Sequence, residues 1–224
     1  MQAWYRPKNL IFAFIAVMGV YVLYHNERFL ITPNDPIWAH YATIKWWLLV
    51  HGLVGMTVFI AGPLQFSERL RRNYARIHRG SGYVYILGIA VLAPLGAIIQ
   101  LIDEKTGGPR SFTVLAVVNA LMLYVFTGLA LLFIIRGRIK QHREWMTRSF
   151  STALVFFEGR FVGGITGWEL MGVEIVQAII WACLIFALIA AEVVNNWQEI
   201  TMLFKPQPKK KSASDADLAL AEGS

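Results

Sequence analysis

The sequence predicts an all-α integral membrane protein, a helical bundle of about six transmembrane helices with both termini in the cytoplasm. Of its 224 residues, 56% are hydrophobic and only 16% are charged, which is too apolar for an ordinary soluble domain. Six apolar stretches approach the roughly 20 residues that a helix needs to cross a bilayer. Lys and Arg residues gather in alternate connections between these stretches, a distribution that orients membrane proteins.

The six expected spans are separated by short polar connections. They cover about residues 4–24, 44–66, 82–102, 112–135, 145–168 and 172–195. The first span has the basic flank of a secretory signal peptide, but no small-x-small cleavage pattern precedes His25, so we expect a retained anchor. Residues 1–204 therefore form one predicted bundle. We expect residues 205–224, which are Lys- and Pro-rich and then acidic, to be a disordered cytoplasmic tail.

The positions of Lys and Arg predict the orientation of the bundle, because these residues are retained on the cytoplasmic side of short loops. The basic residues assigned to that side are Arg6, Lys8, Arg69, Arg71, Arg72, Arg76, Arg79, Arg136, Arg138, Lys140, Arg143, Arg148, Lys205, Lys209, Lys210 and Lys211. The other connections carry only Arg28, Lys45, Lys105 and Arg110. Both termini are therefore expected inside.

The net charge of +7 points to a lipid partner and not to nucleic acid. The basic residues lie in short stretches between apolar runs instead of forming a polar domain, and anionic lipid headgroups are the partner that this arrangement favours. Cys183 is the only cysteine, so an internal disulfide and a Cys-based zinc or iron–sulfur site are excluded.

Four polar residues fall inside the expected spans at similar depth from the outer side: His51, Asn119, Glu158 and Arg160. An ionisable group in a span costs roughly 2.5 to 3.5 kcal/mol on insertion scales, so each asks for a partner or a function. If the helices are neighbours, the four residues form one buried cluster that could bind a quinone headgroup or relay a proton. In the structural alternative, Glu158 and Arg160 neutralise each other and His51 bonds a carbonyl.

Two His-Arg pairs open the third and fifth spans on the inner side. They are His78-Arg79 and His142-Arg143. Two histidines at equal depth on nearby helices could be the axial ligands of haem b, with the arginines pairing with its propionates. The alternative is that the histidines bond nearby loops or headgroups, while the arginines bind phosphate or set the topology.

Glycines recur at every fourth position of the fifth span: Gly159, Gly163 and Gly167. Such a strip lets another backbone approach closely. We expect it to serve helix packing, either within the chain or in a homo-oligomer.

A resemblance to a known family rests on several motifs between about Trp46 and Phe161. The residues that carry it are His51, the segment from Gly62 to Phe66, the His-Arg-x-x-Gly-x-x-Tyr run from His78 to Tyr85, the His-Arg-x-Trp-Met-x-Arg run from His142 to Arg148, and Arg160. Together they resemble a bacterial family of predicted membrane proteins of unknown function.

The resemblance implies a polytopic inner-membrane protein and no particular activity. The polar positions that it implies are His51, Gln65, His78, Arg79, His142, Arg143, Arg148 and Arg160. Glu158 is not among them. The histidines on the third and fifth spans also resemble those of cytochrome b561-like haem bundles, but the fourth span has Asn119 where such a bundle would have a histidine.

The sequence lacks a phosphate-binding glycine loop, a His-Glu-x-x-His metal site and a nucleophile with an evident base, which disfavours hydrolases and nucleotide-driven functions. The leading hypothesis is a redox-associated membrane protein that binds haem b or quinone. The alternatives are a non-catalytic accessory or assembly subunit of a membrane complex and a transporter of small molecules or ions.

Overall fold

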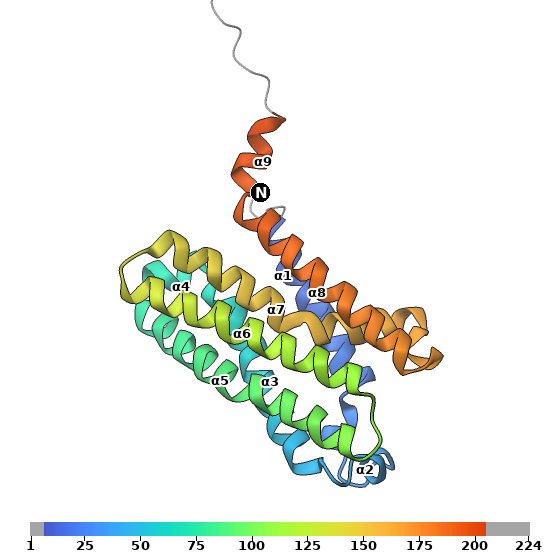
Figure 1. Ribbon diagram of the computed structural model, residues 1–224. Coiled ribbons are helices and arrows are strands. Elements are labelled where there is room, and N and C mark those ends of the chain that lie inside the picture. Colours follow the sequence, from blue (N-terminus) through green and yellow to red (C-terminus); the bar gives the residue numbers. More distant parts are fainter. Residues whose placement is uncertain (1–6, 205–224) are drawn as a thin grey trace, which may run out of the picture.

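The chain forms a bundle of long helices, described in the computed structural model over residues 7–204 (Figure 1). The long helices are α1 (Pro7–His25), α3 (Lys45–Gln65), α5 (Ala75–Lys105), α6 (Arg110–Ile135), α7 (Ile139–Thr166) and α8 (Val173–Asn195). The short ones are η1 (Arg28–Ile31), α2 (Ile37–His40), α4 (Glu68–Asn73), η2 (Trp168–Met171) and α9 (Trp197–Leu203). The described residues contain no strand, and the all-α prediction is confirmed.

Each expected span coincides with one long helix. Four helices, α3, α5, α6 and α8, are long and apolar enough to cross a membrane. The apolar part of α1 is shorter, Asn9–His25, and α7 carries Glu158 and Arg160 in its apolar half. The count of six spans therefore stays a prediction. The start of the first span and the expected tail, residues 205–224, lie outside the described residues.

The long helices pack in the order of the sequence, with α3 on α5, α5 on α6, α6 on α7 and α7 on α8, while α1 also packs on α7 (Figure 1). Helices α3 and α7 meet where this circle of packed helices closes, and they contact each other mainly through side chains. The ring of Phe59 stacks on that of Phe157 with centroids 4.9 Å apart. The space between these two helices matters for the site described below.

Glycines and a proline set the close contacts of α3 and α5. A Cβ at Gly62 would overlap the ring of Phe150, so this glycine allows α3 and α7 to approach. Pro94 lacks the N–H that would bond the carbonyl four residues earlier. That carbonyl, Ala90 O, accepts instead from the Tyr124 hydroxyl of α6 at 2.8 Å, and the interior proline is thereby tolerated in a lipid environment.

The glycine strip of α7 serves packing within the chain at one of its positions and ends the helix at another. A Cβ at Gly159 would lie 2.7 Å from Cγ1 of Ile180 in α8. Gly167 caps the C-terminus of α7 with a φ of 72°, a conformation that glycine adopts without strain.

Candidate functional site

A cavity of about 520 Å³ occupies the half of the bundle that contains the C-terminal ends of α1, α5 and α7. We call this the outer half, after the expected orientation, and the opposite end the inner half. Side chains from all six long helices and from the connection between α1 and α3 line the cavity. Its walls are mostly apolar and include Leu48, Phe59, Phe112, Phe156 and Phe157.

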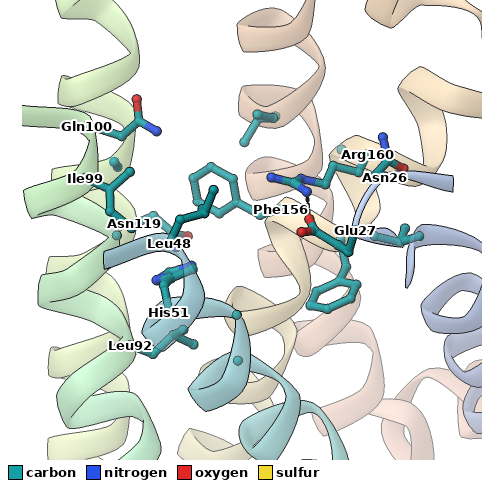
Figure 2. Close-up of a pocket in the computed structure, with 18 of the residues that line it drawn as sticks. Asn26, Glu27, Leu48, His51, Leu92, Ile99, Gln100, Asn119, Phe156 and Arg160 are labelled. Carbon is teal, nitrogen blue, oxygen red and sulfur yellow. Dashed lines mark ion pairs between the residues drawn. The ribbon is translucent and has the colours of Figure 1, made fainter. Parts of the chain in front are cut away.

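His51 and Asn119 lie on one side of this cavity (Figure 2). His51 projects from α3, and its ring lies against α5, where a Cβ at Gly96 would come within 3.3 Å of its Cε1. Its ring interacts with the Leu92 backbone of α5, as the structural alternative expects of His51, while its Nδ1 is buried and has no hydrogen-bond partner among the described residues. Asn119 of α6 is only 6% exposed, and its Oδ1 is likewise without a partner in that part of the chain. Buried polar atoms are usually paired, and these two are exceptions among the described residues.

Arg160 and Glu27 form an ion pair on the other side of the cavity (Figure 2). Next to this pair, Glu169 of η2 accepts hydrogen bonds from Nε2 of His25 at 3.1 Å and from Nδ2 of Asn26 at 3.3 Å. These contacts tie the end of α1 to α7 and η2. The connection after α1 is thereby held over the outer end of the cavity.

Glu158 does not join the outer cluster, and its pairing with Arg160, the structural alternative of the sequence analysis, is not formed. Residues two apart on a helix point about 200° apart, so the two side chains cannot share a face. Arg160 pairs with Glu27, whereas the carboxyl of Glu158 lies near Cys183 of α8. Its Oε2 is buried without a partner among the described residues. The structure thus brings His51, Asn119 and Arg160 to one cavity and places Glu158 outside it.

Glu27, Asn26 and Glu169 also line the cavity, and the sequence analysis did not assign them to a site. They lie in the connections that follow the first and fifth spans, where they were counted only as loop residues. Their position in the sequence could have indicated the site, because both connections are expected on the outer side, at the same end of the bundle as His51 and Arg160.

The inner half brings His78 and His142 to the same level of two parallel helices. Tyr85 follows His78 by seven residues on α5, and Ser149 follows His142 by seven on α7. The Tyr85 hydroxyl and the Ser149 hydroxyl are 2.9 Å apart. Equal offsets therefore place the two histidines opposite each other, two helical turns or about 10.5 Å further inward. They are close enough for their charges to interact.

The two histidines differ in their bonds. Nδ1 of His142 donates to the Ala130 carbonyl at 2.8 Å, which leaves Nε2 as its available nitrogen. Nδ1 of His78 is buried and unpaired within residues 7–204. Arg79 and Arg143 are exposed at the same end and form no ion pair with a described residue. Neither histidine lines the outer cavity.

Comparison with known proteins identifies the family of the chain. No curated protein and no solved structure matches it. A family model described as "Predicted membrane protein (DUF2306)" matches residues 48–195, about two thirds of the chain. The match includes His51, His78, Asn119, His142 and Arg160 and confirms the resemblance to a family of unknown function. The chain therefore belongs to this family of predicted membrane proteins, DUF2306.

Proposed function

We propose that the chain is a multi-pass protein of the bacterial inner membrane, with both termini in the cytoplasm, that binds a quinone or quinol in the cavity of its outer half. The observation that carries this proposal is the pair of unpartnered buried atoms, His51 Nδ1 and Asn119 Oδ1, in a cavity with mostly apolar walls. Ligand sites are typically cavities of roughly 300 to 1,000 Å³ with apolar walls and a few polar groups. A quinone has the matching shape, since its apolar body carries oxygens at the ring.

The cavity residues have distinct parts in this proposal. His51 and Asn119 bind the oxygen at one side of the ring, and His51 can hold or release a proton there. Phe156 lies between the two polar sides (Figure 2) and offers a face for the ring to stack on. Arg160, held by Glu27, supplies positive charge on the far side. The quinone supplies the redox chemistry.

Two measurements test the quinone site. Solvent extraction and chromatography of the protein purified in mild detergent should yield a quinone. Quenching of tryptophan fluorescence by a short-chain benzoquinone should saturate, and His51→Leu and Asn119→Leu should each weaken binding about tenfold, the effect of roughly one lost buried hydrogen bond. Gln177→Leu is the matched control, since Gln177 is a buried amide that does not line the cavity. Unchanged binding in both cavity variants would refute the assignment.

A haem b held by His78 and His142 is the second candidate function. The observation in its favour is the bond from His142 Nδ1 to the Ala130 carbonyl, because ligating histidines usually donate their other N–H to such an acceptor. Arg79 and Arg143 would pair with the propionates. The donor set fits, and the haem would supply one-electron transfer. Protein expressed with added haem should show a Soret band, and a His78→Ala, His142→Ala double variant should lose it.

A non-catalytic accessory or assembly subunit is the alternative from a different class. The polar residues would then serve only to hold helices together, and the chain would act within a homo-oligomer or a larger membrane complex. The basic residues of the inner half would meet anionic lipid headgroups in either case. Absence of both a quinone and a Soret band, together with co-purification of a stoichiometric partner, would favour this alternative, while a transporter would instead take up its substrate into vesicles.

A further inference from the structure

Two of the buried polar atoms of the outer cavity that have no partner among the described residues are hydrogen-bond acceptors. Asn26 shows this without ambiguity, because its Nδ2 already donates to Glu169. The atom of Asn26 that is buried and unpartnered among the described residues is therefore the acceptor, Oδ1. Asn119 Oδ1 is a second such acceptor, in a side chain that is 6% exposed.

Among the charged groups that line the cavity, carboxylates outnumber cations. Three carboxylates, those of Glu27, Asp103 and Glu169, line it together with one guanidinium, that of Arg160. Arg160 is engaged in its ion pair with Glu27. The ionised groups of the cavity therefore favour a ligand that donates hydrogen bonds.

The unpartnered hydrogen-bond acceptors lie on two sides of the cavity. Asn119 and His51 are on one side of the cavity, and Asn26 is on the other with Glu27, with Phe156 between them (Figure 2). The two oxygens of a 1,4-quinone or 1,4-quinol point in opposite directions from the ring. One ring placed between these groups would therefore present an oxygen to each side.

We propose that the cavity binds the reduced form, the 1,4-quinol, in preference to the oxidised quinone; this inference rests on the proposed quinone site. Quinol hydroxyls donate to Asn119 Oδ1 on one side and to Asn26 Oδ1 on the other, while quinone carbonyls leave both acceptors unsatisfied. A buried acceptor without a partner is costly. The donor–acceptor match therefore favours the ligand that carries two O–H groups.

The test compares three ligands of one shape in the full-length protein under anaerobic conditions. They are a short-chain 1,4-benzoquinol, the corresponding quinone and the dimethyl ether of the quinol, which keeps the ring and lacks the donors. We expect the quinol to bind about tenfold more tightly than either of the others. Asn119→Leu and Asn26→Leu should each reduce this ratio, and Gln177→Leu should leave it unchanged.

The possible outcomes distinguish a failure of the quinol preference from a failure of the proposed quinone site. Equal affinity for quinol and quinone, with both weakened by His51→Leu, would overturn the preference while the quinone site stands. No saturable binding of any of the three ligands would overturn the proposed function and the preference together. A quinol preference that persists in both Asn119→Leu and Asn26→Leu would refute the assignment of these two acceptors.

Discussion

Two groups of polar side chains, the Tyr85–Ser149–Thr127 cluster of the inner half and the cavity residues of the outer half, satisfy their hydrogen bonds in different ways. In the inner half, the Ser149 hydroxyl lies 2.9 Å from the Tyr85 hydroxyl and 2.7 Å from that of Thr127. All three residues are buried. In the outer half, His51, Asn119 and Asn26 each keep a buried polar atom without a partner among the described residues. Burial of a polar residue in a membrane bundle therefore does not reveal its role until its partner is known.

This difference predicts different consequences of mutation in the two halves. A satisfied network stabilises the helices that it joins, so its loss should lower stability. An unpaired polar atom contributes no internal bond, so the loss of a side chain such as Asn119 should change ligand binding more than it changes stability.

The largest expected effect is at Tyr85, which is fully buried between α5 and α7. Tyr85→Ala removes a large side chain and its hydrogen bond, and we expect a loss of about 3–5 kcal/mol in the free energy of unfolding. Phe156→Ala, at the wall of the cavity, should cost less because part of that ring already faces empty space. Unfolding in detergent measures both, and equal losses would contradict the contrast between the halves.

The next effect concerns helix packing at Gly62, where an added Cβ would overlap the Phe150 ring. Overpacking of this kind costs about 1–3 kcal/mol, so Gly62→Ala should lower the unfolding temperature. Gly128→Ala is the matched control, since a Cβ there meets no atom of residues 7–204 within 4 Å. It should be neutral or stabilising, because alanine favours the helix. A similar loss in both variants would mean that α3 does not approach α7 at Gly62.

A smaller effect on stability is expected when the loss of one hydroxyl is compared with the loss of one amide. Ser149→Ala removes two interhelical hydrogen bonds, each worth about 0.6 and at most about 1.7 kcal/mol in membrane bundles, so a loss of about 1–2 kcal/mol is expected. Asn119→Leu removes an amide whose Oδ1 is unpaired within the described chain and should not destabilise the fold. Unfolding of both variants without ligand checks this, and a larger loss at Asn119 would reverse the comparison.

Much of the arrangement could be predicted from the sequence because apolar length and basic loops determine which helices exist and where their ends lie. Depth along each helix predicts one level for His51, Asn119 and Arg160, and the three residues line one cavity. The parallel direction of the third and fifth spans placed His78 and His142 at one level. These inferences needed only distance along helices whose direction was known.

The rest of the site depends on the direction of each side chain around its helix and on the path of the connections between helices. Neither can be read from hydropathy. Glu158 has the right depth, but it lies two residues from Arg160 and therefore faces α8 and not the cavity. Glu27 and Asn26 follow α1 in a connection that folds back over the cavity, and nothing in the apolar pattern of residues 26–44 predicts that path. The ion pair of Arg160 with Glu27 could not be predicted without it.

The smallest expected effect concerns Tyr41, in the connection between α2 and α3 at the rim of the cavity. Burial raises the pKa of its phenol above the ordinary value of 10.0, and the charge of Asp103 raises it further. Since the pKa is higher in the folded state, the neutral phenol stabilises the fold below pH 10, and this contribution is lost as the pH rises through the folded-state pKa. The ultraviolet difference between wild type and Tyr41→Phe should therefore give a phenolate midpoint above pH 10. Asp103→Asn should lower that midpoint only partly, because burial is the larger cause. An ordinary midpoint in the wild type would show that the rim beside the cavity is open to water.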